Sequence, residues 1–332
     1  MKRLLYVLFS TVLSFSCLCA CANQTEGSAE PRIRIVTTIF PEYSWIRSIL
    51  GENPSNIDVT LLLDSGVDLH SYQPTMEDIR TISECDLFVY VGGESDEWVE
   101  DVLNETSNQD LTAVSLMEVL GDNVKEEELK EGMEHDHEEH EGENHESEEH
   151  EEPEYDEHVW LSLRNADTLV RHLSTVISEK DPGQEAYYEA QTTDFLAKLN
   201  GLDHNYRSVV DTTEFDVLVF GDRFPFRYLC DDYGLNYYAA FAGCSAETEA
   251  SFQTILFLAD KLNEYGLSSI LTIEGSSQKI AKTMIENTKT GDQNILTLDS
   301  MQGTTAADVE NGADYLGIME KNLETLKIAL NK

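Results

Sequence analysis

Residues 184–210 of this 332-residue chain read QEAYYEAQTTDFLAKLNGLDHNYRSVV, and this stretch decides the architecture that the sequence predicts. Large apolar side chains recur in it at spacings of three, four and seven, which is the period of one helix face. They are Tyr188, Phe195, Leu199, Leu202, Tyr206 and Val210. Asp181 and Pro182 stand just before the stretch and mark a helix start. At 1.5 Å per residue the helix would measure about 40 Å, so we expect a stiff connector over residues 184–212 that runs along two domains.

Short β-rich runs, separated by segments long enough for a helix, flank this connector on both sides. The first four are Ile33–Thr38, Asp58–Leu63, Leu87–Val91 and Leu111–Val114. The second four are Asp216–Phe220, Asn236–Ala240, Ser269–Ile273 and Asn294–Leu298, with helical patterns at Glu247–Tyr265, Ser277–Asn287 and Ala306–Leu330. Strands that alternate with helices indicate βα units and a parallel sheet. The sequence therefore predicts an α/β fold with two parallel-sheet lobes, residues 33–183 and 213–332, joined by a single long rigid helix.

The N-terminal segment has the layout of a bacterial lipoprotein signal. Two basic residues precede an apolar run over residues 4–18, and the sequence Leu-Cys-Ala-Cys over residues 18–21 resembles a lipobox. We expect residues 1–20 to be removed, Cys21 to carry the lipid, and residues 21–32 to be a solvated tether. Later apolar runs are shorter than the roughly 20 residues that span a bilayer. The predicted location is the outer face of the bacterial cytoplasmic membrane.

The formal net charge of -42 excludes one class of partner. So many carboxylates repel the phosphates of nucleic acids and anionic lipids, while they concentrate cations around the protein. We therefore expect no nucleic-acid partner. Beyond the signal and Cys21, the cysteines are Cys85, Cys230 and Cys244. This odd number gives no disulfide framework, although one pair could form in an exported protein.

Residues 126–154 form a tract that is rich in Glu and has hardly any apolar residues. Five of the nine histidines lie in it: His135, His137, His140, His145 and His150. Such a composition cannot build a core, and we expect a disordered loop. Imidazole and carboxylate groups bind zinc and related ions, but ordering a loop around an ion costs entropy. The sequence therefore predicts a weak, auxiliary metal-collecting loop, with a merely acidic linker as the alternative.

A tight metal site needs ligands on rigid elements, and two histidines outside the tract have suitable surroundings. His70 follows a predicted strand in the segment GVDLHSYQP over residues 66–74, and His158 lies in DEHVWL over residues 156–161. Ligands of parallel sheets gather beyond the carboxyl ends of the strands. Either histidine, taken alone, is also compatible with a structural role.

Four segments together resemble the solute-binding lipoproteins of zinc and manganese ABC importers, with ZnuA-like proteins as the most similar group. They are Val36–Pro41, Gly66–His70, Asp156–Leu161 and Asp314–Leu323, in consistent order over nearly the whole mature chain, with the His-rich acidic insertion just before the third. The resemblance implies two α/β lobes joined by a long helix. It also implies that the metal lies in the cleft between the lobes, held by His70 and His158 from the first lobe.

In the second lobe the resemblance implies a His or Glu ligand after the first strand and an acidic ligand after the last. Here the chain departs from the pattern, because Arg223 stands where zinc-binding relatives have a His, and a guanidinium has no lone pair to donate. We expect the neighbouring Asp222 to act as a ligand, with capping of the next turn or pairing with Arg223 as its alternative roles. Asp299, after the last strand, matches the acidic position. Weaker metal candidates are Cys244, Glu247 and Glu274. Cys244 is alternatively a buried thiol, and Glu274 is alternatively a group that orients a ligand.

The sequence thus predicts the extracytoplasmic metal-binding component of an ABC importer, a monomer that delivers its ion to a membrane permease. Two His with two carboxylates suit Mn²⁺ as well as Zn²⁺, while the His-rich tract and the general affinity order favour Zn²⁺. One alternative is a zinc hydrolase, which needs an open coordination position and a base. Another is a metal-binding surface adhesin. The sequence has no His-Glu-x-x-His pair, no repeat and no aromatic patch in support of either, so we expect a protein that is not an enzyme.

Overall fold

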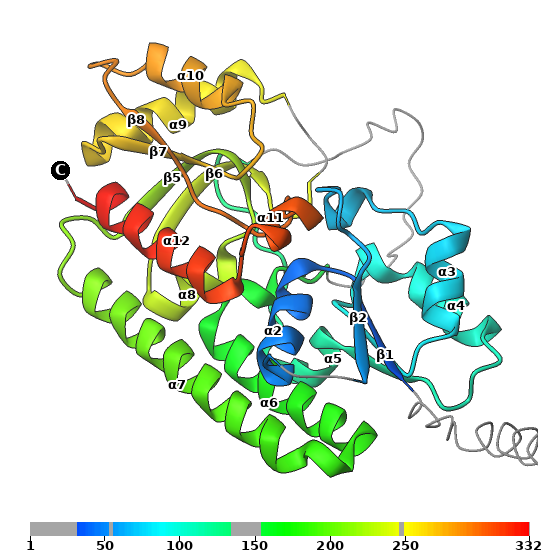
Figure 1. Cartoon of the computed structure of the whole chain (residues 1–332). Coiled ribbons are helices and arrows are strands. Elements are labelled where there is room, and N and C mark those ends of the chain that lie inside the picture. Colours follow the sequence, from blue (N-terminus) through cyan, green and yellow to red (C-terminus); the bar gives the residue numbers. More distant parts are fainter. Residues whose placement is uncertain (1–31, 53–55, 134–153, 246–248, 332) are drawn as a thin grey trace, which may run out of the picture. The chain divides into compact units, whose positions relative to one another are not determined.

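The two sheets have the same strand order, and both are entirely parallel. In the computed structural model, which describes residues 32–52, 56–133, 154–245 and 249–331, the first sheet runs β2-β1-β3-β4 and the second β6-β5-β7-β8. The strands are β1 (Ile33–Thr37), β2 (Ile57–Leu61), β3 (Leu87–Tyr90), β4 (Thr112–Ser115), β5 (Val217–Phe224), β6 (Asn236–Ala242), β7 (Ser269–Thr272) and β8 (Asn294–Thr297). Buried apolar residues follow one another in β3, as is usual where helices cover both faces of a parallel sheet. The predicted α/β fold with two parallel sheets is confirmed (Figure 1).

Helices connect successive strands in both halves of the chain (Figure 1). Those associated with the first sheet are α2 (Phe40–Leu50), α3 (Met76–Ser83), α4 (Trp98–Glu105), α5 (Leu116–Leu120) and α6 (Leu163–Lys180). Those associated with the second sheet are α8 (Arg227–Tyr233), α9 (Phe252–Tyr265), α10 (Lys279–Glu286), α11 (Ala306–Glu310) and α12 (Tyr315–Ala329). We call each sheet with its helices a lobe.

Helix α7 (Glu185–Val210) occupies the stretch in which the sequence predicts the connector. Phe195, Leu199 and Tyr206, all members of the predicted apolar stripe, are buried. The helix contacts α2 and α6 of the first lobe and α8 and α12 of the second, and Tyr206 donates a 2.6 Å hydrogen bond to the Met319 carbonyl. Each large apolar side chain fully buried here contributes about 1.5–3 kcal/mol. One continuous core therefore joins the two lobes, and Ile33–Lys332 form one compact unit.

Besides α9, which begins at Phe252 and not at Glu247, two elements of the second lobe differ from the prediction. Strand β5 continues past Phe220 to Phe224, with a shift of register against β6 between Phe220 and Arg223. The last helical pattern forms two helices, because the chain turns at Gly312, where φ is 89°, and restarts at Asp314, which accepts from the Gly317 amide. The first difference matters for the site, because it places residues 221–224 inside a strand.

The first residues of the acidic tract are ordered and pack against the second lobe, and we call Glu126–Met133 the stem. Glu126 forms an antiparallel bridge with Tyr155. Glu128 accepts a 2.9 Å hydrogen bond from the Tyr237 hydroxyl, and Lys130 Nζ lies 3.7 Å from the centre of the Tyr237 ring. The prediction of a disordered loop that begins at residue 126 is therefore wrong for the stem. The five tract histidines, Cys21 and Glu247 lie outside the described residues.

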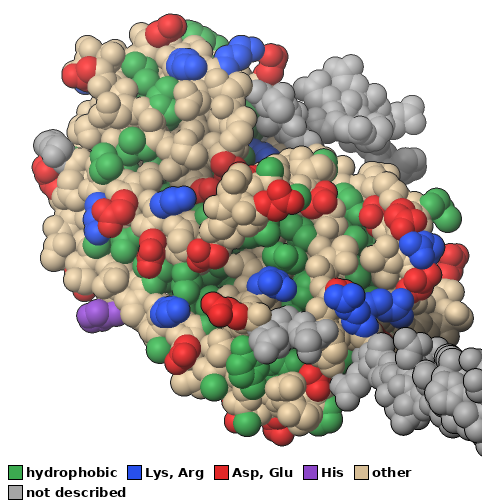
Figure 2. All heavy atoms as spheres, in the orientation of Figure 1, with side chains coloured by type: hydrophobic (Ala, Val, Ile, Leu, Met, Phe, Trp, Pro, Cys, Tyr) green, Lys and Arg blue, Asp and Glu red, His purple; other side chains and the backbone are tan. Residues whose placement is uncertain are grey.

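The charged surface is mixed in sign on the face that Figure 2 shows. Acidic and basic side chains alternate over its described residues without a large field of one sign. Eleven of the 64 acidic residues that produce the net charge of -42 fall in residues 134–153, outside the described ranges. Over the ranges that the structure describes, no helix has both the length and the apolar character that a membrane crossing requires.

Candidate metal centre

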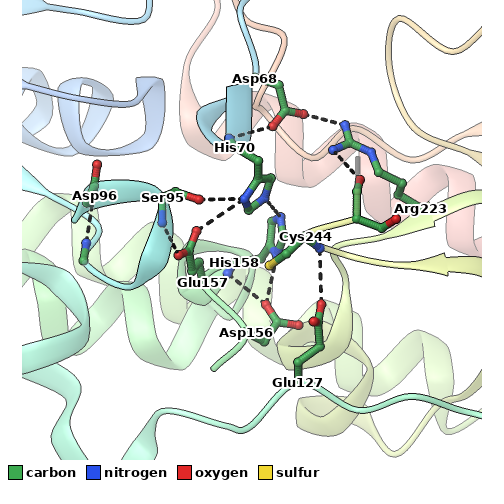
Figure 3. Close-up of polar contacts among 12 residues, drawn as sticks. Asp68, His70, Ser95, Asp96, Glu127, Asp156, Glu157, His158, Arg223 and Cys244 are labelled. Carbon is green, nitrogen blue, oxygen red and sulfur yellow. Dashed lines mark hydrogen bonds and ion pairs between the residues drawn. The ribbon is translucent and has the colours of Figure 1, made fainter. Parts of the chain in front are cut away.

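His70 and His158, which are 88 positions apart in the sequence, meet with their Nε2 atoms 3.1 Å apart (Figure 3). His70 lies on a 3-10 turn, Leu69–Ser71, that follows β2, and Asp68 caps this turn by accepting from the His70 amide at 3.0 Å. His158 immediately precedes the 3-10 turn Val159–Leu161 and is completely buried. Two imidazole nitrogens this close share a proton or a cation, because each carries a lone pair when it is unprotonated.

The opposite nitrogen of each ring is held by a side chain of the first lobe. Asp156 Oδ1 lies 2.9 Å from both the backbone amide and Nδ1 of His158. Ser95 Oγ lies 2.8 Å from Nδ1 of His70, and Glu157 Oε2 lies 3.4 Å from the same nitrogen. Partners of this kind fix the tautomer and the orientation of a metal-binding histidine. They leave the two Nε2 atoms facing each other, as Figure 3 shows.

The approach of Glu157 to the site depends on a glycine after β3. Gly93 has φ 84°, a conformation that residues with a Cβ rarely adopt. A Cβ at this position would also lie 2.5 Å from Glu157 Oε1. The turn after β3 therefore needs glycine at position 93, both for its backbone conformation and to leave room for this carboxylate.

Cys244, just after β6, brings a thiol to the two imidazoles. Over the described ranges, His70, His158 and Cys244 form a group whose ligand atoms all lie within 4.8 Å of one another. The residue before the cysteine has no room for a side chain, because a Cβ at Gly243 would lie 2.9 Å from the Phe224 carbonyl oxygen and 3.0 Å from Cε1 of His158. Two imidazoles and a thiolate are ligand types that bind zinc. The structure thus combines two donors from the first lobe with one from the second.

The three groups differ in how strongly they hold protons. Burial, helped by the charge on His158, lowers the pKa of His70 to about 3. Burial also opposes a charge on His158, but the Asp156 carboxylate is the main group that outweighs it, and the pKa of His158 is raised. Burial raises the pKa of the Cys244 thiol. The Cys244 thiol therefore keeps its proton in the metal-free protein, and His158 binds a proton more readily than a free imidazole does. Any proton on a donor atom must leave before that atom binds an ion.

Arg223 connects the two lobes beside the cluster but cannot act as a ligand. Its guanidinium donates to Asp68, the residue that caps the His70 turn, and to the Ser245 carbonyl at 3.4 Å (Figure 3). Asp222, its neighbour and a predicted ligand, accepts from the Arg223 amide at 3.0 Å. Asp222 lines a separate cavity of about 680 Å³ and does not belong to the cluster found among the described residues. The reason is the extension of β5, which holds both residues in a strand.

Asp299 and Glu274, also predicted from the sequence, lie in the second lobe and do not join the described cluster. Asp299 accepts from the Met301 amide at 2.8 Å, and burial together with Glu274 raises the pKa of Asp299 to about 6. Glu274 accepts four hydrogen bonds of 2.7–3.1 Å from the loop after β8. The donors are the Ser300 amide and hydroxyl and the amides of Gln302 and Gly303. Glu274 therefore braces this loop.

A small acidic cavity adjoins the cluster. It measures about 220 Å³ and is lined by His70, Glu94, Ser95, Glu127, Glu154, Tyr155, Glu157 and Cys244. Four carboxylates at one cavity favour the approach of a cation. The sequence analysis did not predict that Glu127 and Glu157 lie beside the candidate site. The adjacency of Glu157 to His158 was the available signal, whereas Glu127 stands in a run of similar glutamates.

Comparisons with known proteins identify relatives over nearly the whole chain. The family model for the periplasmic zinc-uptake complex component A, ZnuA, matches residues 35–329. The high-affinity zinc uptake system protein ZnuA of Bacillus subtilis is 31% identical over 327 residues, which are 97% of each chain. The zinc-binding lipoprotein AdcA of Streptococcus pneumoniae is 30% identical over 330 residues, 98% of this chain and 61% of AdcA. The chain spans a little over half the length of the AdcA relatives that it matches.

The same relationship holds in three dimensions. The Zn(II)-bound ZnuA-like domain of Streptococcus pneumoniae AdcA has a TM-score of 0.69 to this structure at 26% identity. The superposition covers 91% of this chain and 100% of that domain. The two parallel-sheet lobes and the connecting helix are therefore not peculiar to this sequence.

Proposed function

The chain belongs to the family of periplasmic zinc-uptake components, ZnuA, and on this premise we propose that it captures Zn²⁺ outside the cytoplasm and delivers it to the permease of an ABC importer. The single observation that carries the proposal is the pair of Nε2 atoms of His70 and His158, 3.1 Å apart. Their spacing, their bracing by Ser95 and Asp156, and the acidic cavity beside them all suit the capture of a divalent cation.

In this proposal the ion is held between the lobes by three donors. His70 and His158 bind it through Nε2, and Cys244 binds it through sulfur after any protons on His158 and Cys244 have left. The glutamates of the adjoining cavity attract the cation toward these donors. Because Cys244 belongs to the second lobe, the bound ion links the lobes, and release to a permease requires that this link be broken.

Location, partner and oligomeric state belong to the same proposal. We infer that Cys21 is lipidated and anchors the protein to the outer face of the bacterial cytoplasmic membrane, with a permease subunit as its partner. The lipobox-like sequence over residues 18–21 and the lipoprotein relative support this inference. We also infer a monomer that acts as a binding protein and catalyses no reaction. The matching family, a component of a zinc-uptake complex, supports the role of a binding protein. The tract histidines serve as an auxiliary collecting site.

The site is tested by zinc competition against a chelating dye. We expect His158→Ala and His70→Ala each to weaken tight zinc binding by more than about 100-fold, since loss of an outer partner of a metal-binding histidine already costs 10–100-fold. His204→Ala is the matched control, because this histidine is exposed on α7. Circular dichroism of the metal-free variants verifies the fold. Wild-type affinity in folded His158→Ala protein would overturn the proposed site.

A further inference from the structure

The donor atoms at the cluster differ in type from those that the sequence suggested, and donor type decides which metal a site selects. We propose that Cys244 is the specificity-determining ligand: bound as a thiolate, it makes the site select thiophilic divalent cations such as Zn²⁺ and discriminate against Mn²⁺. This inference rests on the proposed function and refines it, because two imidazoles with carboxylates alone would suit either ion.

The three free cysteines of the described residues have different surroundings. Cys85 and Cys230 are completely buried and belong to clusters of apolar side chains. Cys244 is only partly buried, lines the acidic cavity, and has its sulfur within 4.8 Å of a nitrogen of each imidazole. The role of a packing thiol, which the sequence left open for Cys244, therefore fits Cys85 and Cys230 and does not fit Cys244.

The backbone on both sides of Cys244 is held by side chains of the stem and of β5. Its own amide donates to Glu127 Oε1 of the stem at 3.2 Å. The next carbonyl, that of Ser245, accepts from Arg223, whose guanidinium also binds Asp68 beside His70. The thiol is thus held at the imidazoles by contacts that need no metal. This arrangement also gives Arg223 a role, because it ties the loop of the third donor to the turn that carries the first.

The carboxylates of the second lobe that the sequence suggested as oxygen ligands do not belong to the cluster found among the described residues. Asp222 accepts from the Arg223 amide, Asp299 from the Met301 amide, and Glu274 from the loop after β8. Carboxylate and water ligands suit Mn²⁺, imidazole suits Zn²⁺, and soft thiolates favour Zn²⁺ over Mn²⁺. With nitrogen, nitrogen and sulfur as the clustered donors, the described site has the ligand character of a zinc site.

Cobalt spectroscopy tests whether the sulfur coordinates the ion. Co²⁺ serves as the probe, because a thiolate bound to it produces a charge-transfer absorption in the near ultraviolet that nitrogen and oxygen ligands do not produce. We expect this band in the wild-type protein and in Cys230→Ala, which removes a thiol of the apolar core. We expect Cys244→Ser to bind Co²⁺ without the band. A wild-type cobalt complex that lacks the band would overturn the inference and leave the histidine site intact.

Metal competition tests the consequence for selectivity. We expect Cys244→Ser to lower zinc affinity at least about tenfold, the lower end of the cost of disturbing a metal ligand's partner, with manganese affinity almost unchanged. Cys244→Asp should narrow the ratio of zinc to manganese affinity further, because it provides a carboxylate in place of sulfur. An unchanged ratio in both variants contradicts the inference. Absence of tight zinc binding in the wild-type protein would instead contradict the proposed function, so the two failures are distinguishable.

Discussion

The two lobes share one topology, and each supplies a donor of the proposed metal centre from an equivalent strand. In each sheet the edge strand next to the lobe's first strand is followed by a donor: β2 by His70, and β6 by Cys244. Family resemblance pointed instead to the end of β5, the first strand of the second lobe, where the chain continues as a strand through Asp222. The donor of the second lobe therefore follows the strand that is equivalent to β2, and not the strand to which the family resemblance pointed.

The lobes differ in how they hold their donors. In the first lobe, side chains fix the rings: Asp156 binds His158, and Ser95 binds His70. In the second lobe, the main chain positions Cys244. The Cys244 backbone amide donates a hydrogen bond to Glu127, and Gly243 packs closely against its neighbours. The first lobe therefore presents preorganised ligands, while placement of the third donor depends on the stem and on Arg223.

The largest expected effect is the loss of zinc affinity as the pH falls, because a donor of each lobe gives up a proton when the ion binds. A ligand must be deprotonated, and each displaced proton makes affinity change about tenfold per pH unit. The pKa of Cys244 is raised by burial and that of His158 by Asp156, whereas His70, at about 3, is already neutral. Zinc binding therefore releases a proton from Cys244 between pH 7 and 5, and a second from His158 wherever the pH lies below the raised pKa of this imidazole. Between pH 7 and 5 we expect zinc affinity to fall about 10²–10⁴-fold, measured by dye competition at each pH.

A control variant separates the contributions of the two lobes to this pH dependence. Cys244→Ser removes the thiol proton but leaves His158 beside Asp156. Its zinc affinity should decline less steeply as the pH falls from 7 to 5, by at most about one power of ten per pH unit. Calorimetry in buffers of different ionisation enthalpy counts the released protons directly. An affinity that is flat from pH 7 to 5 in the wild-type protein would contradict this description of both lobes.

Removal of the bracing carboxylate tests the preorganisation of the first lobe. We expect Asp156→Asn to weaken zinc binding about 10–100-fold, because it removes the charge that orients His158 and supports its basicity. Glu127→Ala, which removes the amide contact of Cys244, should cost less, since two braced imidazoles remain. Asp101→Asn on the exposed face of α4 is the matched control. Equal losses in the Asp156 and Glu127 variants would show that the two lobes do not differ in this respect.

Local sequence signals predicted the elements and the two histidines, while the third donor required tertiary structure. Each predicted strand corresponds to an observed one, and the apolar stripe of α7 is buried apart from its half-buried last member, because both patterns are local. The extension of β5 depends on pairing with β6, which no window within β5 reveals. Glu127 is 117 positions from Cys244 and stands among similar glutamates, so nothing local marks it as the partner of that amide. The sequence ranked Cys244 as a weaker candidate because its nearness to the histidines is a property of the fold.

The smallest expected effect on tight zinc affinity comes from removing the part of the acidic tract that lies beyond the stem. Replacing residues 134–152 with a short Gly-Ser linker leaves the contacts of Glu127 and Lys130 with the second lobe in place. We therefore expect tight zinc affinity to change by no more than about 0.5 kcal/mol, the range typical of surface changes. The weak additional equivalents of zinc should disappear. Calorimetric titration with zinc measures both quantities in one experiment.

Two further variants show which property of the tract matters. Replacing its five histidines with Asn keeps the carboxylates, so it should remove the weak equivalents without slowing capture at low salt. The linker variant also loses acidic residues, and its association rate in stopped-flow measurements should fall, because less negative charge attracts the cation. Deleting the stem as well, residues 126–133, should weaken tight binding, since Cys244 then loses its amide partner. A different outcome is that the linker variant, which keeps the stem, loses the tightly bound zinc ion. Residues 134–152 would then supply ligands to the main site, and the second lobe's contribution through Cys244 would have been assigned wrongly.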